Sequence, residues 1–300
     1  TWELRKRLEG LDVSSKELII MEDSSIWMSH GYLGLFHITL NEDLDSVMSF
    51  DKYRGSNGLP EELPYILHET ENGFFISASR GIYQYDMTRN LFFMPEDLNT
   101  FYGDLKLIYL LKEDSGGNIW YSAQDGIGVF RLLEDGTYTN ITTPFMDINN
   151  ARMSPFDNIF IQDPNNIYIG TQKGLVHYDP AIYKNYYDDM YVYINHVRIS
   201  SRREDSLWYY SGNSHLDEKL IENNFSIPYT LNSVSFRFNS PDLENTDQIE
   251  YSYHLENFNE QWSDWTKKNI QEYTNLRWGE YYFEVKARNI YNNISNTDGF

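Results

Sequence analysis

The sequence contains no cysteine among its 300 residues. Disulfides, thiolate metal sites and a cysteine nucleophile are therefore excluded. No apolar run approaches the roughly 18 residues that a membrane-spanning helix requires. Basic residues are also scarce, since 24 Lys and Arg stand against 45 Asp and Glu and give a formal net charge of −21. Because nucleic-acid binding depends on a basic surface, the composition argues against it, and it disfavours anionic membranes for the same reason.

Aromatic residues, in contrast, are abundant. The chain has 25 Tyr, 17 Phe and 7 Trp, and 41% of its residues are hydrophobic. This composition is sufficient for sizeable cores and favours strands over helices. The chain starts at Thr1 rather than at Met, so we expect a fragment or a processed product, and the lack of a signal peptide does not locate the parent protein.

One phrase occurs four times before residue 180. The copies begin at residues 22, 69, 113 and 162, so the steps between them are 47, 44 and 49 residues. Each copy has a polar turn, a bulky strand, a second turn with glycine and an aromatic strand; they include EDSSIWMSHGYLGLFHI, ETENGFFISASRGIYQYD, DSGGNIWYSAQDGIGVF and QDPNNIYIGTQKGLVHYD. A period in the forties with short strands is typical of β-propeller blades. The apolar residues alternate with period two, which argues against a helical repeat.

A continuous apolar run precedes each copy and predicts the innermost strand of each blade. Such runs suit strands that are buried on both faces. The four runs are Leu18–Met21, Tyr65–Leu67, Ile108–Leu111 and Ile159–Ile161.

The repeat ends after Pro180, and a different pattern begins near residue 190. In EYYFEVKARN, from Glu280, residues alternate between apolar and polar, which indicates an antiparallel sheet with one solvated face. About 110 residues of this kind suit an immunoglobulin or fibronectin-type sandwich, and Tyr281 after Gly279 suits a tyrosine corner. We therefore predict an all-β chain with propeller blades over residues 1–186 and a sandwich over residues 187–300. The sandwich strands are expected at Val192–Ser200, Ser233–Asn239, Ile249–Glu256 and Tyr281–Asn289.

Two sets of motifs resemble a known family. YSYHLENFNEQWSDW, followed by EYTNLRWGEYYFEVKARN, resembles the triple-tyrosine (Y_Y_Y) domain of bacterial sensor proteins. The four repeats are similar to the two-component-regulator propeller, and GLPEELPYILHE is similar to that family's lead-in to a blade. Two positions depart from the family pattern, because Arg277-Trp278-Gly279 replaces a Pro-Gly turn and Asn257 replaces a frequent glycine. The matching tyrosines are Tyr251 or Tyr253, Tyr273, and Tyr281 or Tyr282.

The resemblance implies the periplasmic sensor region of hybrid two-component system proteins. It implies about four blades of a larger propeller, with a four-bladed ring as the alternative, and a sandwich that lacks its last strand. The implied function is extracytoplasmic ligand sensing, with an oligosaccharide or another small ligand, a homodimer, and a relay to a kinase or transcription output. Any membrane attachment or kinase would lie outside this chain.

The sequence shows no catalytic or metal-binding constellation. Its seven histidines never occur at ligand spacing, so we expect neither a metal nor a cofactor and no enzymatic activity in this chain. A sialidase box starting at Asp114 would place its glycine at Gly116, but the aromatic Trp120 comes one residue late. A propeller hydrolase or lyase with an accessory sandwich stays an alternative, as does the sensor region of a membrane-linked transcription regulator or a protein-binding adaptor.

The turns between the second and third strands of each blade provide the candidate ligand residues. In propellers these turns lie on the face where the innermost strand begins, and that face commonly carries the ligand. The residues differ between repeats, which a recognition role permits, although exposed turns also vary. They are His30, Tyr32, Arg80, Gln124, Asp125, Gln172 and Lys173.

Overall fold

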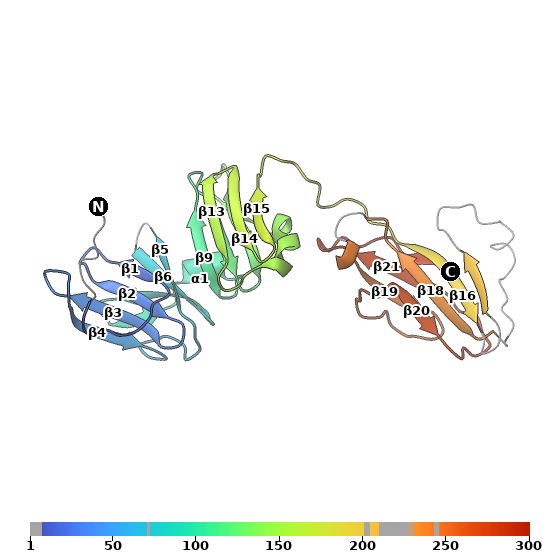
Figure 1. The fold of residues 1–300 in the computed structure, drawn as a ribbon, viewed down its shortest axis with the longest axis horizontal. Coiled ribbons are helices and arrows are strands. Elements are labelled where there is room, and N and C mark those ends of the chain that lie inside the picture. Colours follow the sequence, from blue (N-terminus) through green and yellow to red (C-terminus); the bar gives the residue numbers. More distant parts are fainter. Residues whose placement is uncertain (1–7, 71–72, 201–204, 210–228, 230, 243–245) are drawn as a thin grey trace. The chain divides into compact units, whose positions relative to one another are not determined.

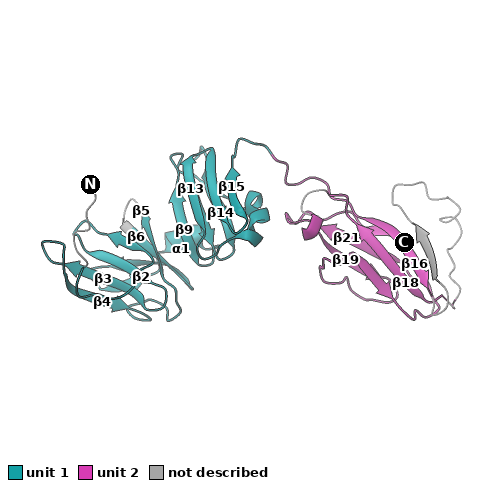
Figure 2. Cartoon of the chain, viewed as in Figure 1, with its two compact units in different colours: residues 1–183 teal, residues 184–300 magenta. Residues whose placement is uncertain are grey.

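A computed structural model describes residues 8–70, 73–200, 205–209, 229, 231–242 and 246–300. The chain divides into two compact units, Thr1–Tyr183 and Lys184–Phe300 (Figure 2). The sequence prediction places the boundary after residue 186, three residues later.

Unit 1 consists of four small antiparallel sheets in chain order (Figure 1). Each sheet is a meander whose spatial order equals its sequence order, as in a propeller blade. The prediction of a partial propeller is therefore confirmed. Blade 1 comprises β1 (Leu18–Ile20), β2 (Ile26–His30), β3 (Gly34–Leu40) and β4 (Val47–Tyr53); blade 2 comprises β5 (Ile66–Thr70), β6 (Gly73–Ala78), β7 (Gly81–Asp86) and β8 (Leu91–Phe93); blade 3 comprises β9 (Ile108–Glu113), β10 (Ile119–Ala123), β11 (Gly126–Leu132) and β12 (Tyr138–Ile141); blade 4 comprises β13 (Asn158–Asp163), β14 (Asn166–Thr171) and β15 (Gly174–Tyr178).

Two short helical segments connect successive blades. Helix α1 (Glu96–Tyr102) joins blade 2 to blade 3, and the 3₁₀ segment η1 (Thr143–Ala151) joins blade 3 to blade 4. Their buried aromatic residues, Tyr102 and Phe145, belong to the cores of the neighbouring blades. The connections therefore add to the packing between sheets.

Each pair of successive blades shares a hydrophobic core. The Trp27 side chain of blade 1 is almost fully buried and lies 5.2 Å from Phe74 and 4.8 Å from Tyr85 of blade 2, measured between ring centroids. Trp120 of blade 3 occupies the same place in the repeat and packs with Ile159 and Ile167 of blade 4. The repeated bulky strand is thus explained by burial, because a blade covers its apolar face only by packing on its neighbour.

Two of the innermost strands, β1 and β13, differ from their predicted environment. Leu18 and Ile20 are 57% and 71% exposed, and Phe160 is 60% exposed. The prediction of burial on both faces is wrong for β1 and β13, where only alternate residues such as Ile19 and Ile159 face the cores between blades. It is confirmed for β5, in which the consecutive residues Ile66 and Leu67 are both buried.

Unit 2 is a sandwich of two antiparallel sheets. One sheet has the order β17 (Asp205–Tyr209), β16 (Tyr193–Ser200), β18 (Ser233–Asn239) and β20 (Ile270–Tyr273); the other has β19 (Glu250–Leu255), β21 (Phe283–Arg288) and β22 (Asp298–Gly299), and η2 (Thr246–Gln248) precedes β19. Phe236 of one sheet stacks on Phe283 of the other at 3.9 Å between ring centroids. The predicted alternation in β21 is confirmed, since its apolar residues Phe283, Val285 and Ala287 are fully buried.

The tyrosines that carry the resemblance support the sandwich. The Tyr281 hydroxyl donates a hydrogen bond to the Arg277 carbonyl oxygen at 3.2 Å, which is the bond of a tyrosine corner. The Tyr251 hydroxyl accepts a hydrogen bond from the Ser240 amide at 3.2 Å. Tyr273 lies in the core, with its ring 6.2 Å from Phe283. These three tyrosines therefore have structural roles.

Candidate functional site

The seven predicted ligand residues lie on the hairpins between the second and third strands of the blades. Each hairpin contacts the segment that leads into the innermost strand of its own blade. In blade 1, His30 Nε2 lies 3.3 Å from Ser14 Oγ, and its Nδ1 accepts hydrogen bonds from the Tyr32 and Leu33 amides. The His30 ring therefore fixes the local turn, while the Tyr32 side chain is 82% exposed.

The hairpins of blades 2 and 3 form exposed ion pairs in equivalent places. Arg80 pairs with Glu62 at 3.0 Å, and Asp125 pairs with Lys106 at 3.3 Å. The Gln124 amide donates to the Leu107 carbonyl oxygen at 2.9 Å. Solvent-exposed pairs of this kind contribute little to stability, so their side chains are available for other contacts.

Blade 4 repeats the arrangement with hydrogen bonds. The Gln172 amide donates to the Ala151 carbonyl oxygen at 2.8 Å, and its side-chain amide donates to the Arg152 carbonyl oxygen at 2.8 Å. The neighbouring Lys173 is exposed. The seven residues thus occupy equivalent positions in four blades, and their ligand role stays a prediction.

A cavity of about 1030 Å³ lies elsewhere, along the innermost strands of the blades. Its lining comes from all four blades: the segment before β1, the strands β5 and β9, and the segment before β13. None of the seven hairpin residues belongs to this lining. The lining residues are Lys16, Glu17, Leu67, His68, Glu69, Tyr109, Leu110, Leu111, Glu113, Asp114, Ser115, Pro155, Phe156, Asp157 and Asn158.

Carboxylates dominate the charge of this cavity. Glu69 and Glu113 are exposed, whereas Glu17 pairs with Lys16 at 3.1 Å and accepts a hydrogen bond from Ser29 Oγ. The lining has five acidic residues and one lysine. The cavity therefore has a negative potential, which suits neutral or cationic ligands.

Asp114 belongs to the lining, but its carboxylate is engaged in hydrogen bonds within its own turn. Its carboxylate accepts hydrogen bonds from the Gly116 and Asn118 amides and from Trp120 Nε1, at 2.8, 3.0 and 2.9 Å. Burial by itself would raise the pKa of Asp114, but these hydrogen bonds outweigh it and hold the pKa below the ordinary value. The box-like motif at Asp114 is thus a structural turn that anchors the buried Trp120.

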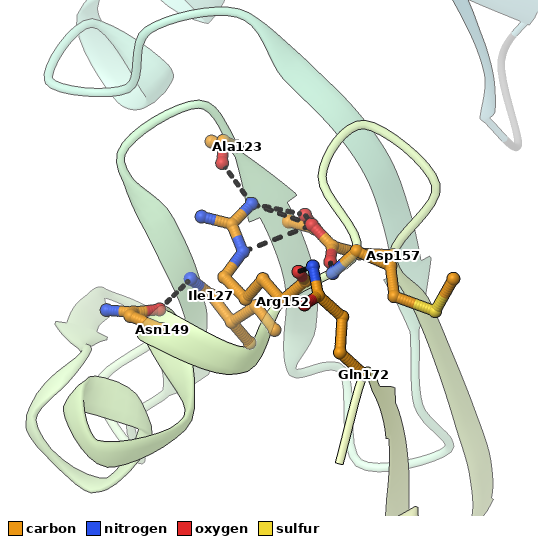
Figure 3. A network of polar contacts seen from close by, with 8 residues as sticks. Ala123, Ile127, Asn149, Arg152, Asp157 and Gln172 are labelled. Carbon is orange, nitrogen blue, oxygen red and sulfur yellow. Dashed lines mark hydrogen bonds and ion pairs between the residues drawn. The ribbon is translucent and has the colours of Figure 1, made fainter. Parts of the chain in front are cut away.

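A buried ion pair fixes the wall of the cavity at blade 4 (Figure 3). Arg152 and Asp157 side chains are 6% and 0% exposed, with Nη2 and Oδ2 2.7 Å apart. Ser122 Oγ donates to the same oxygen at 2.7 Å, and Arg152 Nη2 donates to the Ala123 carbonyl oxygen at 2.5 Å. The Met153 amide donates to Asp157 Oδ1 at 2.8 Å. The network joins β10 to the loop before β13, and it places Phe156, which is 71% exposed, at the cavity.

A buried histidine fixes the wall between blades 2 and 3. His68 is 5% exposed, and its Nε2 donates to the Ile108 carbonyl oxygen at 3.1 Å. Ser77 Oγ accepts a hydrogen bond from the Ile108 amide at 2.8 Å. Burial lowers the pKa of His68 to about 4, although the bond to Ile108 opposes this shift. His68 is therefore neutral at pH 7 and acts as a connector between strands.

The described ranges contain no group of three or more His, Asp or Glu side chains arranged to hold a metal ion. The same ranges have no helix with the length and apolar character needed to cross a membrane.

Sequence reasoning missed the cavity because it treated the innermost strands only as parts of the core. One signal was present in the sequence. Glu69 and Glu113 stand just after the apolar runs, and both are exposed and line the cavity.

Comparison with known proteins supports the resemblance found in the sequence. Residues 242–298 match the Y_Y_Y domain family. The fold is similar to the extracellular domain of the putative hybrid two-component system BT3049 from B. thetaiotaomicron, with a TM-score of 0.50 and 20% sequence identity over 97% of this chain. The chain spans 38% of the length of that domain.

A second similar structure is the extracellular domain of the putative hybrid two-component system BT4673 from the same organism. Its TM-score is 0.34 and its identity 15%, over 95% of this chain and 36% of that domain. No curated protein sequence matches this chain. The predicted resemblance is confirmed: unit 2 carries a Y_Y_Y domain, and the chain has the fold of such extracellular domains.

Proposed function

We propose that this chain is the extracytoplasmic, periplasmic ligand-sensing region of a two-component signal transduction sensor. The observation that carries the proposal is the cavity of unit 1, which four blades line together, in a chain that also carries a Y_Y_Y sandwich. The fold similarity to the BT3049 extracellular domain supports the same role.

The ligand that fits the cavity is an oligosaccharide. Sugars are recognised by hydrogen bonds to their hydroxyl groups together with aromatic faces for their rings. The cavity provides both, since Glu69, Ser115 and Asn158 offer exposed polar groups, and Tyr109 and Phe156 offer aromatic surface.

The role proposed for the cavity is binding without catalysis. Asp114 and Asp157 have their oxygens engaged by the Trp120 turn and by Arg152, so they maintain the shape of the wall. Ligand binding in a homodimer would bias two states of the assembly, and the Y_Y_Y sandwich would relay the change to a kinase or transcription output.

Calorimetric titration with a panel of neutral oligosaccharides tests the proposal, followed by product analysis of each mixture. We expect heat of binding with the sugar recovered intact. Tyr109→Ala and Glu69→Ala should weaken binding by about tenfold or more, since each removes a direct contact. Glu134→Gln, at an exposed turn of blade 3 outside the cavity, should leave the affinity unchanged.

Two results would change the assignment. Cleaved sugar would make the protein a carbohydrate-active enzyme. Loss of binding in Arg80→Ala and Gln124→Ala, with full binding in the cavity variants, would move the site to the hairpin face.

A further inference from the structure

One sheet of unit 2 carries a small cavity on the face that points away from the sandwich core. Val197, Phe236 and Tyr273 are buried in that core, and side chains alternate between the two faces of a strand. The intervening residues of β16, β18 and β20 therefore point outward. The cavity has a volume of about 380 Å³, and its lining residues are His196, Arg198, Ser235, Arg237, Ile270 and Glu272.

The strand register sets these six residues in two rows across the sheet. One row is His196, Arg237 and Ile270, and the next is Arg198, Ser235 and Glu272. On one face of an antiparallel pair, opposite Cβ atoms lie about 4.5–5.5 Å apart and diagonal neighbours about 7–8 Å. Arg198 and Arg237 are diagonal neighbours, and Ser235 is next to both on this face. Their three side chains can therefore reach one small ligand together.

The positive charge of this cavity contrasts with the acidic composition of the chain. The sequence has 45 Asp and Glu against 24 Lys and Arg, but the lining has two arginines and one glutamate. Arg237 is exposed and forms no ion pair within the described residues of the chain. Burial lowers the pKa of His196, and the charge of Arg237 lowers it further. His196 is therefore neutral at pH 7, and the positive charge of the cavity belongs to its two arginines.

We propose that Arg198, Arg237 and Ser235 bind a sulfate or phosphate group, either as the inorganic ion or as an ester on a small ligand. A guanidinium group presents its N–H donors in a planar fork that fits two oxygens of such a group. Two forks from different strands suit a tetrahedral oxyanion, which has more oxygens than one fork can bind. The Ser235 hydroxyl offers a further donor beside both arginines. The two like charges then bind one anion instead of repelling each other.

The dimensions and the charge of the cavity favour a small ligand over a long polyanion. Its volume lies near the lower end of the range of about 300–1,000 Å³ that small-molecule pockets have. A polyanion would meet the repulsion of a chain with a net charge of −21, whereas one oxyanion responds mainly to charges within about 10 Å at roughly 0.1 M salt. Glu272 ends the row opposite Ser235 and opposes a second anionic group there. Ile270, opposite Arg237, offers apolar surface to the carbon part of an ester.

Calorimetric titration of the 300-residue chain at low ionic strength tests the proposal. The probes are inorganic phosphate, inorganic sulfate, glucose 6-phosphate and glucose 6-sulfate, with glucose as the neutral control. We expect saturable binding of the anions, no binding of glucose at the same concentrations, and weaker binding as sodium chloride is added. Equal affinity for ion and ester assigns the site to the free ion, whereas an ester that binds about tenfold more tightly assigns it to an organic ligand.

Charge-changing variants separate this site from general attraction of anions. Arg198→Gln and Arg237→Gln should each weaken binding by about tenfold or more, since each removes a charge-assisted contact. Glu272→Gln should strengthen binding by about two- to fivefold, because it removes a partly screened repulsion, and a folding defect would not produce this gain. Arg277→Gln, at an exposed arginine outside the lining, is the matched control and should leave the affinity unchanged.

The proposal has clear failure outcomes. It is overturned if no anion binds saturably, if neither Arg198→Gln nor Arg237→Gln weakens binding, or if Arg277→Gln weakens it equally. Thermal denaturation establishes that each variant stays folded. The site shares no lining residue with the cavity of unit 1, so a failure to bind neutral oligosaccharides would leave it standing.

Discussion

Nε2 of His68 lies 3.1 Å from the Ile108 carbonyl oxygen and connects β5 of one blade to β9 of the next. Both residues are buried. A side chain whose pKa is lowered by burial to about 4 thus holds two innermost strands together behind the cavity wall. This contact gives the first prediction.

Acid should weaken unit 1 through His68. In the folded protein, burial lowers the pKa of His68 to about 4, against 6.5 for an ordinary histidine. As the pH falls from 6.5 to 4, the unfolded chain binds a proton that the folded chain does not, so the free energy of unfolding decreases across this window and levels off below it. The total loss is about 3 kcal/mol.

His68→Gln keeps a donor for Ile108 and removes the titration. The difference in unfolding free energy between wild type and variant should therefore narrow between pH 7 and pH 4, measured by urea denaturation with hydrogen exchange of β5 and β9. The other titrating groups are the same in wild type and variant, so their contributions to the free energy of unfolding cancel in this comparison. A difference that stays constant with pH would show that His68 does not carry the acid sensitivity.

Breaking the Arg152–Asp157 pair should destabilise unit 1 strongly. Asp157→Asn leaves a buried guanidinium without its counter-charge, and such a change costs about 3–5 kcal/mol of unfolding free energy. Urea denaturation measures the loss. Glu62→Gln, which removes the exposed partner of Arg80, is the matched control and should have little effect. Equal losses of unfolding free energy in the two variants would contradict a stabilising role for the buried pair shown in Figure 3.

The tyrosine corner should stabilise the sandwich by one hydrogen bond. Tyr281→Phe removes the hydroxyl that donates to Arg277 and should lower the unfolding free energy of unit 2 by about 1 kcal/mol. Thermal denaturation followed by near-ultraviolet circular dichroism detects the change. Tyr282→Phe, at a side chain that is 47% exposed, should have a smaller effect, and the reverse order would refute the assignment.

The cavity should discriminate against acidic sugars. Glu69 and Glu113 repel a uronic-acid oligosaccharide, so a neutral analogue of equal length should bind more tightly, and the gap should narrow at high salt. Glu69→Gln should improve binding of the acidic sugar by about two- to fivefold, as expected for one partly screened charge. Calorimetry at two ionic strengths measures both effects. A preference for the acidic sugar would show that the cavity is not the ligand-binding site.

The fold was largely predictable, because it depends on patterns that repeat. The bulky strand that contains Trp27 in blade 1 and Trp120 in blade 3 recurs because each of these blades buries the equivalent face against its neighbour. The alternation of buried and less buried residues in β21 arises because one face of its sheet lies on the core and the other on solvent. The helical segment α1 was not predicted; its seven residues are a short connection, and tertiary packing of Tyr102 decides its conformation.

The cavity was harder to predict than the fold. Tyr109 and Leu110 belong to an apolar run but line the cavity, and periodicity cannot separate an exposed position from a buried one in a short apolar run. The Arg152–Asp157 pair also left no local signal, because its partners Ser122 and Ala123 come from a different blade.

The hairpins of unit 1 are each tied to the lead-in segment of their own blade, as Arg80 is to Glu62 and Asp125 is to Lys106. Substitutions in different hairpins share no contact partners among these pairs, so their energetic effects should add. Recognition on this face could therefore diversify by exchanging single blades, with each new hairpin brought in together with its own lead-in and without compensating changes in the neighbouring repeats.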